Sequence, residues 1–346
     1  MKSTTLIILA AAIAALGVGL LLMTDILDSR PHLVSESREL MGERIEIAIY
    51  HHDGDSAKQA IDSAFSRMVE VESVLSPIAR DSEVNELNRS NYLPSASDTL
   101  VATLRLANVV HRISGGAFDV SAGALRELWT YDAEMQTPLS DQDYDVQSAS
   151  VSAALKHVGM DRLLLGSGRQ TSISLVPGTL LDLGPLAMGT AIDAAIDALR
   201  DAGIEHALVG ARGHWRAIGG QPDGSSWAIL PNHQSRDDIG SFLLADSAMA
   251  IDCNCEWQPS CLTREARVLD PRTGYPIARS CYVGVVAPTA AEAGALAASV
   301  LILGEEPGLA LIDQLAYTEM VIQYCDNLEH ICESSGMTQY REKLDH

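Results

Sequence analysis

The sequence predicts an α+β fold in which mixed sheets are covered by packed helices. Two patterns lead to this prediction. Short segments with alternating apolar residues are typical of strands, and longer segments with apolar residues every three or four positions are typical of helices; the two follow one another without a strict strand–helix–strand rhythm. The composition agrees, since 47% of the 346 residues are hydrophobic and 20% are charged, as in a globular chain with a large core.

The first half of the chain contains one predicted strand and two long predicted helices. Residues 44–52, RIEIAIYHH, alternate and predict the strand. Residues 56–76 and 97–114 place apolar side chains at helical spacing and predict the helices. The segment GGAFDVSAGALRELW, 115–129, begins with two glycines and leads into helical sequence, whereas the polar, acidic residues 131–148 predict a surface loop.

The second half is richer in predicted strands. The segments SISLV and TLLDL predict a hairpin over 172–183, and a helix is predicted over 187–202. Further short strands are predicted in HALVG, WRAIGG, SWAIL, SFLLADSAMAID, YVGVVAP and MVIQY. The last predicted helix, 289–303, begins at the capping residue Thr289 and ends at Gly304.

The N-terminal segment has the composition of a membrane anchor. The stretch from Leu6 to Met23 is almost wholly apolar and uncharged, which approaches the length of a membrane span and exceeds the apolar region of most cleaved signal peptides. Lys2 precedes it and Asp25 follows it, so the body is expected outside the cytoplasm. We therefore expect an uncleaved transmembrane helix over 1–25 in the inner (cytoplasmic) membrane, with the body in the periplasm; a cleaved signal is the alternative.

The charge and the cysteines limit the partners and the compartment. A net charge of −22 repels nucleic acid, which excludes it as a partner. The six cysteines all lie in the C-terminal third: Cys253, Cys255, Cys261, Cys281, Cys325 and Cys332. Their spacing lacks the repeated C-x-x-C of a zinc site, so disulfides are favoured over a metal and over redox activity. Cys325 and Cys332 are one candidate pair, and the other four can pair in several ways.

The stretch VLDPRTGYP, 268–276, predicts a rigid turn. Gly274 tolerates a positive φ, and Pro271 and Pro276 restrict the backbone on either side. We predict that Asp270 makes local hydrogen bonds within this turn, with a ligand contact as the alternative.

Seven short stretches occur in an order that resembles the ApbE family, the FAD:protein FMN transferases. They are MGERIEI, SPIARDSEVNELN, GGAFDVSAGALRELW, LLDLGPLAMGTAIDAAIDALRDAGI, GGQPDGSSWAI, VLDPRTGYPIA and VVAPTAAEAGALAASVLILG. The resemblance covers about 41–315. It implies an ApbE-like domain over 38–325, between a linker at 26–37 and a C-terminal tail at 326–346.

Members of that family bind FAD and Mg²⁺, cleave the FAD pyrophosphate and transfer FMN to a Thr or Ser of a partner flavoprotein. The resemblance therefore implies FAD and Mg²⁺ as cofactors, and an acceptor flavoprotein of a membrane redox complex as partner. The matching positions imply cofactor contacts for Met41, Ala117, Phe118, Asp119, Asp182 and Leu269. For Asp119 and Asp182, local capping of the backbone is the alternative interpretation.

Three positions depart from the family where its chemistry takes place. Gly294 and Ala298 stand where the family supplies metal ligands from an Asp and a Thr, and Arg267 stands where it has a His proposed as catalyst. These side chains provide neither a ligand oxygen nor a base. We expect the transferase activity to be reduced or lost; the alternative function is a non-catalytic flavin-binding or scaffold protein in redox-complex assembly.

Two groups of residues offer substitutes for these losses. Arg212, His214 and Arg267 form either a basic pocket for phosphate or a set of exposed basic residues, which is the more common case. Asp252 and Glu256 carry oxygens for a metal, although their spacing does not single them out.

Overall fold

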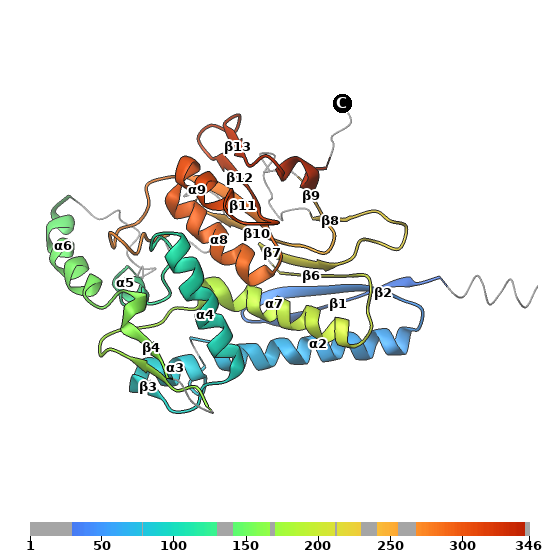
Figure 1. The fold of residues 1–346 in the computed structure, drawn as a ribbon, viewed down its shortest axis with the longest axis horizontal. Coiled ribbons are helices and arrows are strands. Elements are labelled where there is room, and N and C mark those ends of the chain that lie inside the picture. Colours follow the sequence, from blue (N-terminus) through green and yellow to red (C-terminus); the bar gives the residue numbers. More distant parts are fainter. Residues whose placement is uncertain are drawn as a thin grey trace, which may run out of the picture.

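An eight-stranded sheet forms the centre of the protein in a computed structural model that describes residues 30–77, 79–129, 141–166, 170–211, 213–229, 241–254 and 268–342 (Figure 1). Its strands, in spatial order, are β1 (His32–Leu40), β2 (Glu43–His51), β6 (Ala207–Ala211), β7 (His214–Ile218), β10 (Ala248–Cys253), β11 (Cys281–Ala287), β12 (Glu319–Tyr324) and β13 (Ile331–Glu333). Two smaller sheets consist of β3 (Tyr92–Leu93), β5 (Ile173–Leu175) and β4 (Leu163–Leu165), and of β8 (Trp227–Ile229) and β9 (Phe242–Leu244).

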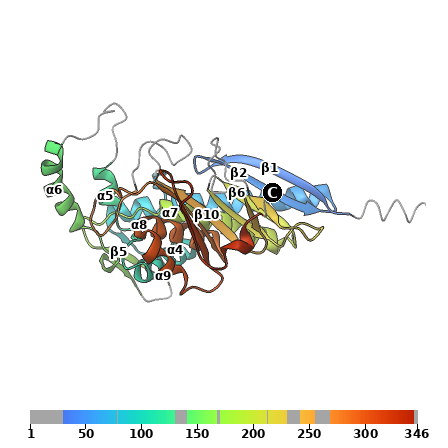
Figure 2. The same cartoon turned by 90° about the horizontal axis from the view of Figure 1, so that it is seen from above.

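Helices cover one face of the large sheet and a hairpin covers the other (Figures 1 and 2). The helices are α2 (Gly54–Leu75), α3 (Glu83–Ser90), α4 (Asp98–Ile113), α5 (Gly123–Leu128), α6 (Asp141–Leu155), α7 (Gly184–Asp201), α8 (Ala290–Leu303) and α9 (Glu305–Ile312). The main core lies between the sheet and α2, α4, α7 and α8. A second core lies between the opposite face, the β8–β9 hairpin and the short 3₁₀ helix Met337–Tyr340.

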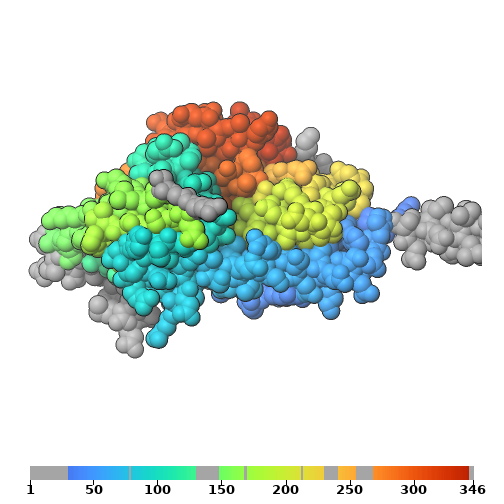
Figure 3. Space-filling model, turned by 60° about the horizontal axis from the view of Figure 1, so that its bottom comes forward, coloured from blue at the N-terminus to red at the C-terminus, as the bar shows by residue number. Residues whose placement is uncertain are grey.

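The N-terminal and C-terminal parts of the domain lie on opposite sides of its middle segment, blue and red against green and yellow in Figure 3. Helix α7 joins them, because it contacts both α2 and α8. The approach to α8 is close at Gly189, where a Cβ would lie 2.6 Å from the backbone of Ala290. Asp193 of α7 accepts hydrogen bonds from the Ala290 and Ala291 backbone N–H groups at 2.8 and 3.0 Å, and this caps the start of α8.

The α+β architecture and its long helices are confirmed, but the sheets are not mixed. Every pairing between named strands is antiparallel. The predicted hairpin over 172–183 is wrong: β5 pairs with β3 and β4, while Leu180 forms a parallel bridge with Ala122. β5 therefore pairs with strands distant in sequence and not with the next apolar segment. Alternation of apolar residues predicts a strand but does not identify the strand with which it pairs.

Three segments adopt structure where the sequence predicted none. Residues 32–37, assigned to a linker, form most of β1, an edge strand whose many polar residues hide its alternation. The loop predicted at 131–148 is helical from Asp141 onward, within α6 at one end of the molecule (Figure 2), and its earlier part lies outside the described residues. Part of the predicted tail, 331–340, forms β13 and the 3₁₀ helix.

The cysteine pairing differs from the candidate pair. Cys253 and Cys325 each take part in a disulfide, whereas Cys281 and Cys332 are free thiols. The pairing of Cys325 with Cys332 is therefore wrong, because the β12–β13 register places Cys332 opposite Ile322 instead. Burial raises the pKa of Cys281 to about 12, so this thiol stays protonated and unreactive at neutral pH. Cys255 and Cys261 lie outside the described residues.

Within the part of the chain that the structure describes, no helix combines the length and apolar character needed to cross a membrane. The anchor predicted at 1–25 lies outside that part.

Candidate functional site

Two backbone segments far apart in sequence run side by side and bring Asp119 and Asp182 close together. The Asp182 N–H donates to the Val120 carbonyl at 2.7 Å, and the Gly123 N–H donates to the Leu180 carbonyl at 3.0 Å. Asn88 of α3 fixes the second segment from the other side. Its amide exchanges two hydrogen bonds with the Leu181 backbone, at 2.9 and 2.7 Å. A helix, a loop and a strand-like segment therefore determine where the two carboxylates lie.

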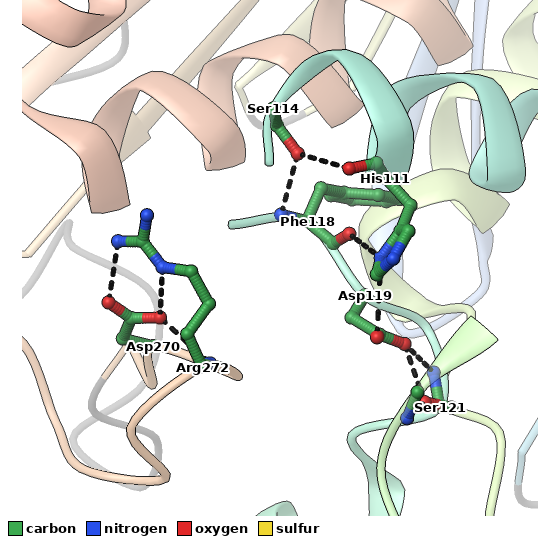
Figure 4. A network of polar contacts seen from close by, with 8 residues as sticks. His111, Ser114, Phe118, Asp119, Ser121, Asp270 and Arg272 are labelled. Carbon is green, nitrogen blue, oxygen red and sulfur yellow. Dashed lines mark hydrogen bonds and ion pairs between the residues drawn. The ribbon is translucent and has the colours of Figure 1, made fainter. Parts of the chain in front are cut away.

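Asp119 is buried in a local network (Figure 4). Its side chain is 4% exposed, and its Oδ1 accepts hydrogen bonds from the Ser121 N–H and hydroxyl at 2.8 and 2.5 Å. The His111 Nδ1 lies 3.3 Å from Asp119 Oδ2 and 3.0 Å from the Phe118 carbonyl. The carboxylate raises the pKa of His111 because it stabilises the imidazolium. Asp119 therefore caps local backbone, and its cofactor contact stays a prediction.

Asp182 also caps local backbone and forms an ion pair. Its Oδ1 accepts a hydrogen bond from the Gly184 N–H at 3.0 Å, at the start of α7. Its Oδ2 pairs with the Nε of Arg126 from α5, whose side chain is 54% exposed. Arg126 was not predicted as a site residue, because nothing in the sequence around it indicates that it pairs with Asp182, 56 positions later.

The turn at 268–277 has the local hydrogen bonds predicted for Asp270. Asp270 Oδ1 accepts from the Arg272 N–H at 2.9 Å, and its two oxygens take a bidentate ion pair from the Arg272 guanidinium at 2.9 and 2.7 Å (Figure 4). Gly274 has a φ of 76° and donates to the Asp270 carbonyl at 2.8 Å. Leu269 bridges to Pro276 and closes the turn.

This turn packs on the segment that carries Asp119. The Trp129 indole Nε1 donates to the Gly274 carbonyl at 2.9 Å, and its ring meets the Tyr275 ring edge-on at 6.0 Å between centroids. The stem of Arg272 passes Gly116, where a Cβ would lie 3.6 Å from the Arg272 Cγ. Residues 115–129, 180–184 and 268–277 therefore form one unit, which we call the three-segment assembly.

Five of the six predicted cofactor residues belong to the three-segment assembly: Ala117, Phe118, Asp119, Asp182 and Leu269. Met41 is not linked to them. It occupies the tight turn between β1 and β2 with a φ of 55°, packs against the main core, and donates its backbone N–H to Glu72 of α2 at 3.1 Å.

Each aspartate of the assembly is paired with a basic side chain: Asp119 with His111, Asp182 with Arg126, and Asp270 with Arg272. The two arginines are 54% and 40% exposed, so their outer N–H groups remain accessible to solvent or ligand.

Two of the three positions expected to depart from the family pattern, Gly294 and Ala298, lie on α8, against the sheet. Gly294 faces His214, the first residue of β7, and a Cβ on Gly294 would lie 2.9 Å from the His214 Nε2 and 3.1 Å from the Pro185 carbonyl oxygen. Ala298, one helical turn later, is 9% exposed. Among the described residues, no group of three or more His, Cys, Asp or Glu side chains is arranged to hold a metal. The donor set therefore does not fit a divalent cation at this position.

Asp252 on β10 is a half-buried carboxylate. Its neighbours Ile251 and Cys253 point into the second core, so Asp252 points to the opposite, α8 side of the sheet. Its Oδ1 accepts a hydrogen bond from the Cys253 N–H at 2.9 Å, and burial raises its pKa to about 6. Arg212, Glu256 and Arg267 lie outside the described residues, so the basic-pocket and substitute-metal hypotheses are untested.

The comparisons with known proteins agree on one family. The family model described as the ApbE family matches residues 41–322. The chain is similar to the FAD:protein FMN transferase of Vibrio cholerae, with 26% identity over 287 residues, 79% of this chain and 82% of that protein. It is also similar to the FAD:protein FMN transferase of Haemophilus influenzae, with 24% identity over 316 residues, 85% of this chain and 88% of that protein.

Two solved structures share the fold. The flavin transferase ApbE from Vibrio cholerae superposes with a TM-score of 0.72 at 24% identity, over 90% of this chain and 99% of that one. The ApbE protein from Thermotoga maritima superposes with a TM-score of 0.76 at 20% identity, over 90% of this chain and 100% of that one. The architecture is therefore that of the family over nearly the whole described chain.

Proposed function

The chain belongs to the ApbE family, and from this premise we propose that it is an FAD-binding protein of the FAD:protein FMN transferase type whose transfer activity is strongly reduced or lost. Its relatives carry the name of that activity, which requires FAD and an acceptor protein. The proposal separates the two parts of the function: binding of the dinucleotide is retained, and the chemical step is not.

The three-segment assembly supports FAD binding. Its buried Phe118 and its closed turn at Leu269 keep the backbone in one conformation, which lowers the entropic cost of binding. The half-exposed guanidiniums of Arg126 and Arg272 are suited to phosphate oxygens, because each presents several N–H donors in one plane. We assign cofactor contacts to the six predicted residues: Met41, Ala117, Phe118, Asp119, Asp182 and Leu269.

The α8 position carries the second part of the proposal. Cleaving a pyrophosphate requires neutralisation of charge on the transferred phosphoryl group, and a bound Mg²⁺ would supply it. Gly294 and Ala298 offer no ligand oxygen, and the His214 ring packs where a side chain at 294 would extend. Because acid–base groups contribute about 10²–10⁴-fold and metal ions several kcal/mol, we expect a rate at least about 10²-fold below that of an intact relative.

We further propose a location and a partner. The apolar segment from Leu6 to Met23 would hold the domain at the outer side of the cytoplasmic membrane, where the partner would be a flavoprotein of a membrane redox complex. If catalysis is absent, the same contacts would serve a flavin-binding or scaffold protein during assembly of such a complex. Carbonate extraction of membranes and protease treatment of spheroplasts test the location: the chain should stay in the membrane fraction and be digested from outside.

The experiment that tests the function measures binding and transfer separately. The chain is incubated with FAD, Mg²⁺ and an acceptor flavoprotein, beside the Vibrio cholerae relative, and covalent flavin is read by in-gel fluorescence. We expect FAD to quench intrinsic fluorescence with saturation, and covalent flavin to form at least about 10²-fold more slowly than with the relative. Equal flavinylation would contradict the loss of activity. Absence of saturable FAD binding would contradict the flavin role and favour the scaffold alternative.

A further inference from the structure

We infer that His214 occupies the cation position beside α8, so that this chain binds the pyrophosphate of its dinucleotide through an imidazole N–H and without a divalent metal. The choice of a flavin dinucleotide as the ligand rests on the proposed function. The occupation of the position by His214 rests on the packing of β7 against α8, and it is tested separately.

The His214 ring takes up the space next to Gly294 into which a side chain at this position would extend. With a Cβ on Gly294 only 2.9 Å from the His214 Nε2, an Asp side chain at 294 would require the His214 ring to move from its place. Glycine inside a helix costs about 1 kcal/mol relative to alanine, so a glycine in the middle of the buried helix α8 needs a packing reason. The His214 ring provides that reason.

Several side-chain oxygens near Gly294 are already occupied by hydrogen bonds. The Ser299 hydroxyl donates to the Ala295 carbonyl at 2.7 Å within α8, and the Asp193 carboxylate is occupied by two backbone N–H groups and by Arg216 at 2.7 Å. Ala298 lies one turn after Gly294 on the same helical face and has no polar atom in its side chain. The Pro185 carbonyl lies 3.1 Å from the Cβ position of Gly294, and one carbonyl does not make a Mg²⁺ site.

In place of a metal ion, the His214 imidazole provides a hydrogen-bond donor at this position. β7 holds His214 opposite Ala250, and Ala250 belongs to the core on the helix side of the sheet, so the ring is held between sheet and helix. An imidazole N–H donates to a phosphate oxygen without a metal. The position thus changes from a cation site, which neutralises charge and supports cleavage, to a neutral or singly charged donor that supports binding.

The test of occupation uses Mn²⁺ alone, without flavin. We titrate Mn²⁺ into the full chain and follow free Mn²⁺ by electron paramagnetic resonance, with His51→Ala as a surface control for the weak background expected from the acidic surface. The wild type should show only that background. The triple variant H214A/G294D/A298T should gain one saturable site per chain, at least tenfold tighter than the background.

The double variant G294D/A298T is the matched comparison, because it restores both oxygens but keeps the ring. We expect no gain of Mn²⁺ binding in the double variant. A gain equal to that of the triple variant would overturn the role of His214. The inference would be overturned outright if the wild type bound one tight Mn²⁺ per chain, the His51→Ala control kept this site, and H214A changed its dissociation constant at least tenfold.

A second measurement covers the case in which the aspartate variants do not fold. FAD is titrated into the wild type with excess Mg²⁺ or with a chelator, by fluorescence quenching. We expect the two dissociation constants to agree within twofold, and H214A to weaken binding at least fivefold in both. A dissociation constant at least tenfold lower with Mg²⁺ would overturn the inference. If FAD does not bind under either condition, the proposed function fails. The Mn²⁺ titrations alone then decide whether His214 occupies the cation position.

Discussion

The three-segment assembly and the α8 corner around Gly294 belong to one domain but differ in the polar groups that they bring together. In the assembly every aspartate is paired, the turn is closed, and the predicted cofactor residues other than Met41 lie together. In the α8 corner the metal ligands expected from the family are absent, and a histidine ring takes up the space.

The difference follows from what each region contributes to stability. The backbone hydrogen bonds between 120–123 and 180–182, the Asp182–Arg126 pair and the Trp129–Gly274 hydrogen bond hold the three segments together, so losing them costs free energy of folding. A metal-binding aspartate contributes no such packing, and its burial costs free energy when the metal is absent. Residues that serve only chemistry can therefore disappear from a fold that otherwise persists. The predictions below test this comparison.

The largest effect is expected at the turn of the assembly. Gly274→Ala combines a positive φ of 76° with a Cβ 2.6 Å from the Val151 Cγ1, so it should destabilise the protein by about 2–4 kcal/mol. Gly203→Ala is the matched control, since Gly203 has a φ of 78° and no atom within 4 Å of its Cβ position. It should cost only about 1 kcal/mol. Urea unfolding measures both, and equal losses would show that the turn does not pack as described.

The next largest effect is expected in the α8 corner, where Gly294→Ala should change stability in opposite directions with and without the His214 ring. Gly294→Ala should destabilise the wild type by about 1–2 kcal/mol, because the new methyl group meets the His214 ring. In the His214→Ala background the same change should stabilise the protein by about 1 kcal/mol, since alanine is the better helix former. The double-mutant cycle from thermal unfolding gives the coupling. Additive effects would mean that the ring does not occupy this space.

Asp252→Asn should stabilise the protein above pH 6. Burial raises the folded-state pKa of Asp252 from 3.8 to about 6. The contribution of Asp252 to stability is therefore fully present below about pH 4 and is lost as the pH rises through about 6. Each pKa unit corresponds to about 1.4 kcal/mol, so asparagine should gain about 1–3 kcal/mol at pH 7 and little at pH 4. Unfolding at both pH values measures this, and a gain independent of pH would contradict the assignment.

The smallest effect lies within the assembly, at His111. Asp119→Asn removes the carboxylate that raises the His111 pKa, so this pKa should fall toward or below its ordinary value. The stability that the pair contributes is present below pH 6.5 and is lost as the pH rises through the folded-state pKa, so the variant should lose less than about 1 kcal/mol, and only at acidic pH. Imidazole proton shifts in NMR follow the titration. An unchanged titration would show that another group sets the His111 pKa.

The sequence by itself determined the features that depend on neighbouring residues. Alternation and helical spacing identified β2, α2, α4 and α8, and the helix caps and the Asp270 turn followed from side chains within three positions of the backbone they bind. The order of seven short motifs identified the family, because it reflects the whole chain.

Only the tertiary structure decided the features that depend on distant residues. The antiparallel order of the sheet, the pairing of β5 with β3 and β4, and the place of the polar edge strand β1 follow from which surfaces bury together. The same holds for the partner of Asp182, which comes from α5, and for the ring of His214 against Gly294, 80 positions away. A residue pattern records local geometry, but a contact between distant segments is fixed only when the core closes around both.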